Sequence, residues 1–306
     1  MEKKNKYSQL KSLLLLLMTA AIWGFAFVAQ KFGAQNLGNF TFNGIRFLLG
    51  AASLLPVILI FDHSGWEKKT LWYTVRVAAG SGALLFIAAS LQQYGIIYTD
   101  NAGTSSFLTG LYNLLTPILA FLIWKKKTGL PVWIGAVLAL GGLYFLCNPA
   151  HSSGVSRESY WLGVILLIVG AVFWALQILY IDHVVANVSA LKFAMFQFIT
   201  CGILCLICAA FLERQYLTDF SAMRSALIPI LYCGLCSVGI AYTCQIIGQK
   251  TADPTFAAIV LSTESVFGAL GGVLFGNERM SLLGVVGCVL IFAGILVAQY
   301  QPQKRE

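Results

Sequence analysis

The sequence alternates between long apolar runs and short polar segments. The runs are about 16 to 23 residues long and carry few charges. A helix needs about 20 apolar residues to cross the roughly 30 Å hydrocarbon core of a bilayer. We therefore predict ten transmembrane helices, of which the fifth is short. Their ranges are Leu10–Ala29, Thr41–Phe61, Trp72–Gln93, Ala102–Trp124, Pro131–Leu146, Trp161–Ile181, Leu191–Phe211, Ala226–Ile247, Pro254–Phe275 and Leu282–Tyr300.

The pattern also indicates the type of secondary structure. In lipid every backbone polar group needs a partner within the protein, so only helices and closed barrels cross a membrane. A barrel requires alternating apolar and polar residues, and the runs lack this alternation. Hydrophobic residues make up 58% of the 306 positions and charged residues 10%, whereas soluble domains carry about 25% charged residues. The predicted fold class is an all-α membrane protein.

The basic residues predict the orientation in the membrane. The net charge is +8, but the Lys and Arg residues form short clusters between apolar runs, so we expect no nucleic-acid partner. Lys and Arg collect on cytoplasmic loops. With a cytoplasmic N-terminus, the inner side holds Lys3, Lys4, Lys6, Lys11, Lys68, Lys69, Lys125, Lys126, Lys127, Lys192, Lys250, Lys304 and Arg305. The outer side holds Lys31, Arg157, Arg214, Arg224 and Arg279. Both termini are therefore expected to be cytoplasmic.

Cysteines and nucleotide motifs add no further chemistry. Cys201, Cys205, Cys208, Cys233 and Cys236 lie inside apolar runs, where a thiol usually serves as a small packing residue. The chain contains no GxxxxGK[ST] loop and no HExxH motif, so we expect no metal and no cofactor.

The two halves of the chain resemble each other at a nearly constant offset. The offset is 151 early in the halves and 152 later. The matched pairs are Trp23 and Trp174, Arg46 and Gln197, Phe47 and Phe198, Gln93 and Gln245, Thr99 and Thr251, Gly135 and Gly287, Val137 and Val289, and Gly142 and Gly294. We predict one five-helix repeat over residues 10–147 and another over 160–300, joined by the polar segment Asn148–Tyr160. Five is an odd number, so the second repeat enters the membrane from the opposite side, as in many secondary transporters.

Glu264 is the leading candidate for a functional residue. It lies ten residues into the ninth run, about 15 Å deep at 1.5 Å per residue. Its mate at the 152 offset is Tyr112, at the same depth in the fourth run. An ionisable group in a membrane span is expensive and usually functional. We interpret the pair as part of a midplane substrate site, with Glu264 contacting cargo or accepting a proton. The alternative is a hydrogen-bonded Glu that ties helices together.

Several other polar groups are candidates for lining such a site. Pro117 frees the backbone carbonyl of Asn113, which suits a gate or a cavity wall, although membrane helices also tolerate proline. Arg46 either attracts an anionic or carboxylate group, snorkels outward, or holds a helix-end carbonyl. The remaining candidates are Trp23, Gln93, Trp174, Gln177 and Gln245. For each amide the alternative is an interhelical hydrogen bond, worth about 0.6–2 kcal/mol.

Three segments resemble one family of membrane proteins. They are TAAIWGFAFVAQKFG…FTFNGIRFLLGA (Thr19–Ala51), SSFLTGLYNLLTPILAFLIWKKKTGLPVWIGAVLALGGLYFL (Ser105–Leu146) and ADPTFAAIVLSTESVFGALGGVLFGNERMSLLGVVGCVLIFAGILVAQ (Ala252–Gln299). The chain resembles the drug/metabolite transporter superfamily, in particular proteins with two EamA domains. The family often has Glu-Pro where this chain has Glu264-Ser265, and many repeats carry Gly-Glu-Arg where Lys125–Lys127 stand. The second repeat keeps Asn277-Glu278-Arg279, which we interpret as a helix turn in an outer loop.

The resemblance implies export or exchange of small metabolites, such as amino acids or amphipathic compounds, by alternating access. We therefore expect a non-enzymatic, multi-pass permease of the plasma or inner membrane. Its expected partners are a small-molecule substrate and the lipid bilayer, with protons as a further candidate. The alternatives are a membrane-embedded enzyme or lipid-handling protein that uses Glu264 as acid or base, and a membrane protein without transport. Monomer and homodimer both stay open.

Overall fold

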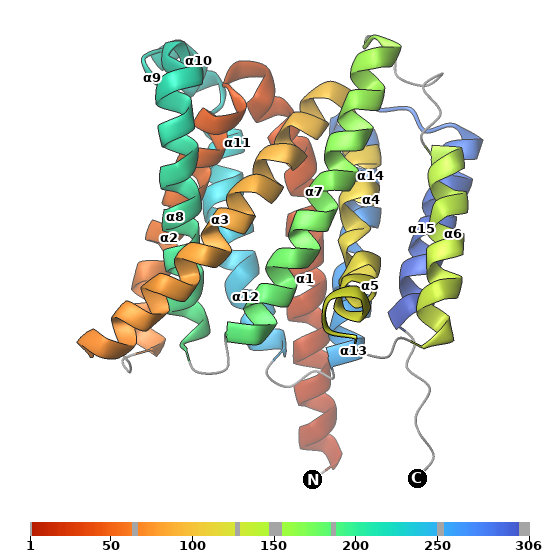
Figure 1. Ribbon diagram of the computed structural model, residues 1–306, viewed down its shortest axis with the longest axis horizontal. Coiled ribbons are helices and arrows are strands. Elements are labelled where there is room, and N and C mark those ends of the chain that lie inside the picture. The colour runs from red at the N-terminus through yellow and green to blue at the C-terminus, as the bar shows by residue number, and fades with distance from the viewer. Residues whose placement is uncertain are drawn as a thin grey trace.

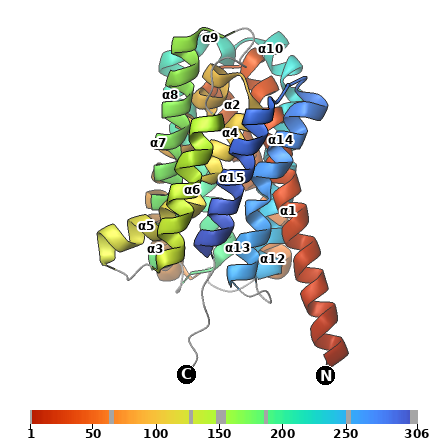
Figure 2. The same cartoon turned by 90° about the vertical axis from the view of Figure 1, so that its right-hand side faces the viewer.

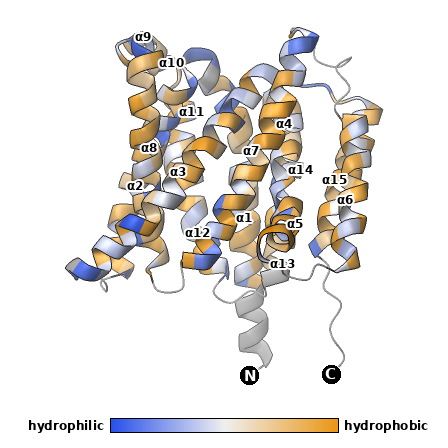
Figure 3. Cartoon of the chain, in the orientation of Figure 1, coloured by the Kyte–Doolittle hydropathy of each residue, from blue (hydrophilic) through white to orange (hydrophobic). Residues whose placement is uncertain are grey.

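The computed structural model describes residues 2–62, 67–125, 129–146, 155–184, 188–249 and 254–299. This part of the chain is a bundle of helices without strands (Figure 1). Apolar residues cover much of the helices' length, and hydrophilic residues gather toward the two ends of the bundle (Figure 3). Nine helical segments within it are long and apolar enough to cross a membrane, and the shorter apolar helix Leu130–Leu146 is a tenth. The predicted all-α membrane fold is confirmed.

The helices of the first half correspond to the first five predicted runs. They are α1 (Glu2–Asn36), α2 (Asn39–Phe61), α3 (Lys68–Thr99), α4 (Ala102–Gly110), α5 (Tyr112–Trp124) and α6 (Leu130–Leu146). α1 and α3 extend well beyond their predicted ranges at both ends. The 32 residues of α3 would extend about 48 Å, and the helix crosses the bundle diagonally (Figure 1).

The helices of the second half correspond to the other five runs, with two short helices in one connection. They are α7 (Arg157–Val184), α8 (Ala190–Leu212), α9 (Arg214–Leu217), α10 (Phe220–Ser225), α11 (Leu227–Leu231), the π-helical stretch η3 (Tyr232–Ala241), α12 (Tyr242–Gln249), α13 (Pro254–Ser262), α14 (Glu264–Phe275) and α15 (Leu282–Gln299). The eighth run, predicted as one helix, is a continuous succession of α11, η3 and α12. α7 runs in the direction opposite to α1 (Figure 1).

Equivalent helices of the two halves pack in a reciprocal pattern. α2 packs on α8, and α6 packs on α15, so both contacts join a helix to its own counterpart. α3 packs on α7. In the equivalent contact with the two halves exchanged, α1, the counterpart of α7, packs on η3 and α12, the counterparts of α3. The rings of Phe47 and Phe198, mates at the 151 offset, stack with centroids 5.8 Å apart. This is the pattern that a pseudo-twofold axis between the halves produces.

Glycines allow α6 and α15 to approach closely. A Cβ added at Gly142 would lie 2.6 Å from the carbonyl oxygen of Gly287, and one added at Gly294 would lie 2.6 Å from that of Gly135. Gly135 and Gly287 are repeat mates, as are Gly142 and Gly294. The crossing of α6 and α15 therefore contains two equivalent glycine–carbonyl contacts. Small residues at crossing points allow backbones to come together in membranes, where packing rather than the hydrophobic effect holds helices.

Carboxylates at helix ends bind α2 and α8 to each other. Glu213 follows α8 and accepts hydrogen bonds from the backbone N–H of Thr41 (2.8 Å) and of Phe40 (3.1 Å) at the start of α2. Asp62 follows α2, accepts from the hydroxyl of Ser189 and pairs with Lys192 at 3.4 Å at the start of α8. Asp62 and Glu213 are mates at the 151 offset. Each thus stabilises the positively polarised N-terminus of the other half's helix.

Candidate functional site

The fourth and ninth predicted spans are each broken into two helices at equivalent residues. Each span is long and apolar enough to cross a membrane, as predicted, and the interruption within it was not predicted. α4 gives way to α5 at Leu111, and α13 gives way to α14 at Thr263, 152 residues later. The backbone at both breaks stays in the right-handed region, with φ −59° and ψ −20° at Leu111 and φ −64° and ψ −10° at Thr263. The second halves therefore begin at Tyr112 and at Glu264.

The breaks bring Tyr112 and Glu264 together. Their side chains interact directly, and Asn113 is a further partner of the Tyr112 phenol. Glu264 is half-buried and occupies the first position of α14, where the helix dipole favours a negative charge. The ring of Trp174, on α7, lies 6.5 Å from that of Tyr112. The two halves of the chain therefore each contribute to one polar and aromatic centre.

Paired serines hold the two broken spans against each other. The Ser106 hydroxyl donates to the carbonyl of Ser265 at 3.1 Å, and the Ser265 hydroxyl donates to the carbonyl of Ser106 at 3.2 Å. Ser265 stands where the family often has proline, so the break at Thr263 forms without one. Sequence reasoning did not identify Ser106, because a serine in an apolar run gives no signal of its partner.

The two broken spans differ in shape. α5 turns away from the axis of α4 and is seen end-on in Figure 1, whereas Figure 2 shows it projecting sideways from the bundle. α13 and α14 follow one another along the bundle axis in both views. Pro117 lies inside α5, beyond the break at Leu111. The repeats are therefore alike in their break points and different in the direction of the segment that follows.

A chain of amides continues the polar centre. The indole N–H of Trp174 donates to Gln92 Oε1 at 2.8 Å, and Gln92 Nε2 contacts Gln30 Oε1 at 3.4 Å. Gln93 Nε2 donates to the carbonyl of Gln30 at 3.0 Å. Gln93 Oε1 is buried without a hydrogen-bond partner among the described residues. Polar groups from α1, α3 and α7 thus form one continuous chain of polar contacts inside the bundle.

The remaining candidate residues lie in other places. The indole N–H of Trp23 donates to the Ser237 carbonyl at 2.9 Å and so joins α1 to η3. Gln177 donates to Gln197 Oε1 at 3.1 Å, which ties α7 to α8 in the manner of the interhelical alternative. Gln245 is half-buried on α12.

Arg46 is not brought to the Glu264 centre. It is buried on α2, and its guanidinium carbon lies 4.6 Å from the centroid of the Phe47 ring. Its Nε donates to Asn43 Oδ1 at 2.8 Å, and Cys233 on η3 is a further partner. This cluster lies between α2, α8 and η3.

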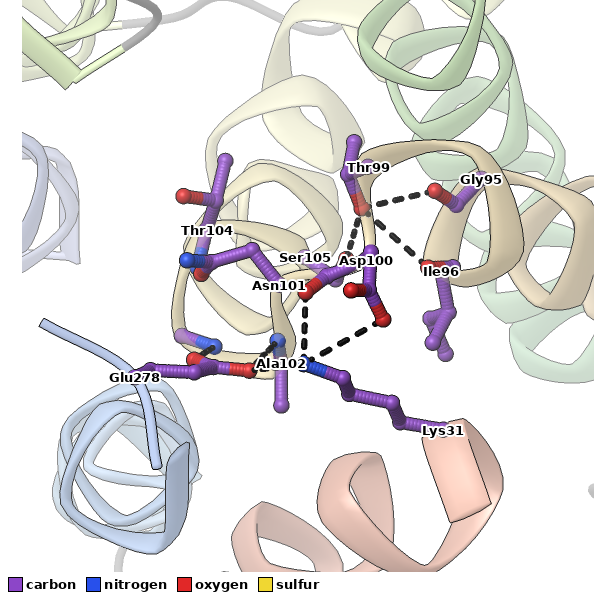
Figure 4. A network of polar contacts seen from close by, with 11 residues as sticks. Lys31, Gly95, Ile96, Thr99, Asp100, Asn101, Ala102, Thr104, Ser105 and Glu278 are labelled. Atoms are coloured by element: carbon purple, nitrogen blue, oxygen red, sulfur yellow. Dashed lines mark hydrogen bonds and ion pairs between the residues drawn. The ribbon is translucent and has the colours of Figure 1, made fainter. Parts of the chain in front are cut away.

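A second polar network joins the end of α1, the α3–α4 junction and the segment after α14 (Figure 4). Lys31 Nζ, near the end of α1, lies 3.1 Å from Glu278 Oε1 and 3.3 Å from Asp100 Oδ1. Glu278 also accepts the backbone N–H of Ala102 at 2.6 Å and of Gly103 at 3.0 Å, at the start of α4. We call Lys31, Asp100 and Glu278, with the α4 N-terminus, the Lys31–Glu278 network. The sequence placed Lys31 and Glu278 on one side of the membrane but interpreted Glu278 only as a helix turn.

The described residues contain no group of three or more His, Cys, Asp or Glu side chains that could hold a metal ion. Glu278 of this network also lines a pocket, and Asn101, Tyr160 and Arg279 are among its other lining residues. It lies at the end of the bundle and does not include Glu264 or Tyr112.

The sequence profile of the EamA-like transporter family matches residues 10–148 and 161–300. An uncharacterized transporter of Archaeoglobus fulgidus is 27% identical over 92% of this chain and 83% of its own length. The uncharacterized transporter YoaV of Bacillus subtilis is 23% identical over 97% and 99% of the two chains. The uncharacterized inner membrane transporter YedA of Escherichia coli is 23% identical over 90% and 87%. A solved crystal structure shares the fold with a TM-score of 0.66 and 19% identity, covering 94% of this chain and 97% of that one. The chain belongs to the EamA-like transporter family and is a multi-pass membrane protein.

Proposed function

We propose that the protein is a secondary transporter that moves small metabolites or amphipathic compounds through the centre formed by Tyr112 and Glu264. One observation carries this proposal. Two spans related by the repeat are broken at equivalent residues, Leu111 and Thr263, and the breaks bring Tyr112 and Glu264 into contact. Broken helices at the interface of inverted repeats are the usual frame of a transporter's substrate site. The domains in this proposal are the repeats 10–147 and 160–300.

Alternating access requires a contact between the repeats that opens and closes. The Lys31–Glu278 network supports this requirement, because it links α1, the α3–α4 junction and the segment after α14 at one end of the bundle. The start of α1 and the end of α15 lie at the opposite end (Figure 1). With cytoplasmic termini, the network is an extracellular gate, and cargo reaches the centre from outside after Lys31 and Glu278 separate.

The membrane-enzyme alternative receives no support from the comparisons, since the three relatives above are all named as transporters. Glu264 serves better as a contact for cargo or protons than as a catalytic group. Its partner Tyr112 and the neighbouring Asn113 offer hydrogen bonds and an aromatic face, but no strong nucleophile.

Transport by purified protein tests the proposal. Thermal stabilisation in detergent is first screened against amino acids, nucleosides and amphipathic cations, and the hits are assayed for counterflow in proteoliposomes. We expect at least one stabilising compound to be transported, and Glu264→Gln to abolish its transport while leaving folding intact. Glu213→Gln is the matched control, because Glu213 is a buried carboxylate that caps α2 outside the centre. Counterflow that is equal in Glu264→Gln and wild type would contradict the proposal.

A further inference from the structure

The central carboxylate has no basic partner in the described part of the chain. The ion pairs there join Lys31 to Asp100 and Glu278, and Lys192 to Asp62. Tyr112 is the side chain with which Glu264 interacts. An ionised carboxylate inside a membrane protein needs a cation or a proton to neutralise it.

The basic residues of the described chain are engaged or located elsewhere. Arg46 is buried within α2, and no ion pair joins it to a carboxylate of the described residues. It stacks on Phe47 and donates to Asn43 in the cluster between α2, α8 and η3. Lys31 and Lys192 belong to ion pairs at the two ends of the bundle. Basic residues elsewhere whose exposure is described lie on the surface, namely Lys11, Lys69, Arg76, Lys125, Arg157, Arg214, Arg224 and Arg279. No basic residue of the described chain therefore supplies a neutralising charge at Glu264, which leaves the site open to a cation from outside the protein.

Aromatic rings stand next to this carboxylate. Tyr112 presents its ring at 40° to that of Trp174, with centroids 6.5 Å apart. The hydrogen bond from Trp174 to Gln92 holds the indole in place. Phe267 lies one turn beyond Glu264 on α14 and packs on Phe25 with centroids 6.1 Å apart. Ring faces attract organic cations and also stack on aromatic bodies.

From these contacts we infer that the cargo of this centre is a cationic amphipathic molecule: a protonated or quaternary amine attached to an aromatic or apolar body. The inference rests on the proposed transport function and specifies its substrate class. The ammonium group binds Glu264, and the apolar body lies against Tyr112 and Trp174. A carboxylate on the cargo is disfavoured, because the centre offers no Lys or Arg among the described residues to receive it, and Glu264 repels it. Amines are therefore preferred over amino acids and over organic acids.

Three probes with one phenyl ring and different charges test this class. Phenethylamine is a cation, phenylalanine a zwitterion and phenylacetate an anion. Binding is measured by calorimetry on the full chain in nanodiscs at neutral pH. We expect phenethylamine to bind at least about tenfold more tightly than phenylalanine, a difference that corresponds to about 1.4 kcal/mol, and phenylacetate to bind weakest.

Variants assign the effect to the named residues. Glu264→Gln is expected to lose at least about tenfold in phenethylamine affinity, and Glu264→Asp to restore part of it. Trp174→Leu should weaken phenethylamine binding, while Glu213→Gln leaves the affinity unchanged. Size-exclusion profiles of each variant confirm that it is folded. Equal or tighter binding of phenylalanine or phenylacetate, absence of phenethylamine binding, or unchanged affinity in Glu264→Gln would each overturn the inference.

Counterflow in proteoliposomes separates this inference from the transport proposal. Glu264-dependent binding of phenethylamine without counterflow would preserve the ligand class and contradict transport. Glu264-dependent counterflow of phenylalanine or phenylacetate without that of phenethylamine would preserve transport and overturn the class.

Discussion

Tyr112 and Glu264 lie 152 residues apart in the sequence and face each other at the first residues of two equivalent half-helices. One supplies a phenol and the other a carboxyl group. The fold of the two repeats is therefore similar where they meet, while their chemistry differs. Because Glu264 is acidic and Tyr112 is not, the charged group of a bound cargo is drawn to one side of the pseudo-twofold axis.

Protonation of Glu264 should weaken the binding of a cationic cargo. A proton neutralises the carboxylate, so affinity for phenethylamine falls as the pH is lowered, and Glu264→Gln removes this dependence. Calorimetry of wild type and Glu264→Gln at several pH values measures the effect. A pH profile in Glu264→Gln that keeps the slope of wild type would assign the titration to another group.

The Lys31–Glu278 network should contribute to stability mainly through Glu278. Breaking a buried ion pair costs about 3–5 kcal/mol, and Glu278→Ala also removes two hydrogen bonds to the α4 N-terminus. Lys31→Met leaves those two bonds in place. We therefore expect Glu278→Ala to lower the midpoint of thermal unfolding more than Lys31→Met does. The reverse order would mean that the α4 cap is not a major part of the network.

The close crossing of α6 and α15 gives a test with a neighbouring control. Gly142→Ala places a Cβ 2.6 Å from the Gly287 carbonyl oxygen, and overpacking of this kind costs about 1–3 kcal/mol. At Gly141 an added Cβ meets nothing within 4 Å, so Gly141→Ala should be neutral or stabilising by up to about 1 kcal/mol. Thermal unfolding in detergent compares the two. Equal behaviour of both variants would show that the crossing tolerates a wider separation.

Much of this architecture follows from the sequence. The apolar runs predict the spans, because a bilayer sets their length, and the offset of 152 residues alone pairs Tyr112 with Glu264. The breaks at Leu111 and Thr263 were not predicted. Both are non-glycine, non-proline residues in right-handed backbone, so neither carries the usual signal of a helix end.

The sequence also did not predict which side chains contact each other between helices. Charge counting places Lys31 and Glu278 on the same face, but only the packing of α1 against α14 brings them to 3.1 Å. For Arg46 the sequence left an anion site and two structural roles open, and the structure places its guanidinium group against the Phe47 ring and Asn43.

The Lys31–Glu278 network also has an expected effect on access to the centre. Lys31→Met weakens the gate, so a reporter thiol introduced by Asn113→Cys in a cysteine-free chain should react faster with an impermeant maleimide from the extracellular side. Lys192→Met is a control, because Lys192 pairs with Asp62 at the other end of the bundle. An equal increase in both variants would indicate general loosening of the fold.

Alternating access around the Tyr112–Glu264 centre is tested most directly by labelling that reporter thiol from each side of the membrane. Right-side-out and inside-out vesicles carrying the cysteine-free Asn113→Cys chain are treated with the impermeant maleimide, and Ala139→Cys, in the buried α6–α15 contact, serves as the unreactive reference. We predict that the thiol at position 113 reacts from both sides and that position 139 reacts from neither. Reaction of position 113 from one side alone, or from neither, would contradict a centre that opens alternately to the two sides.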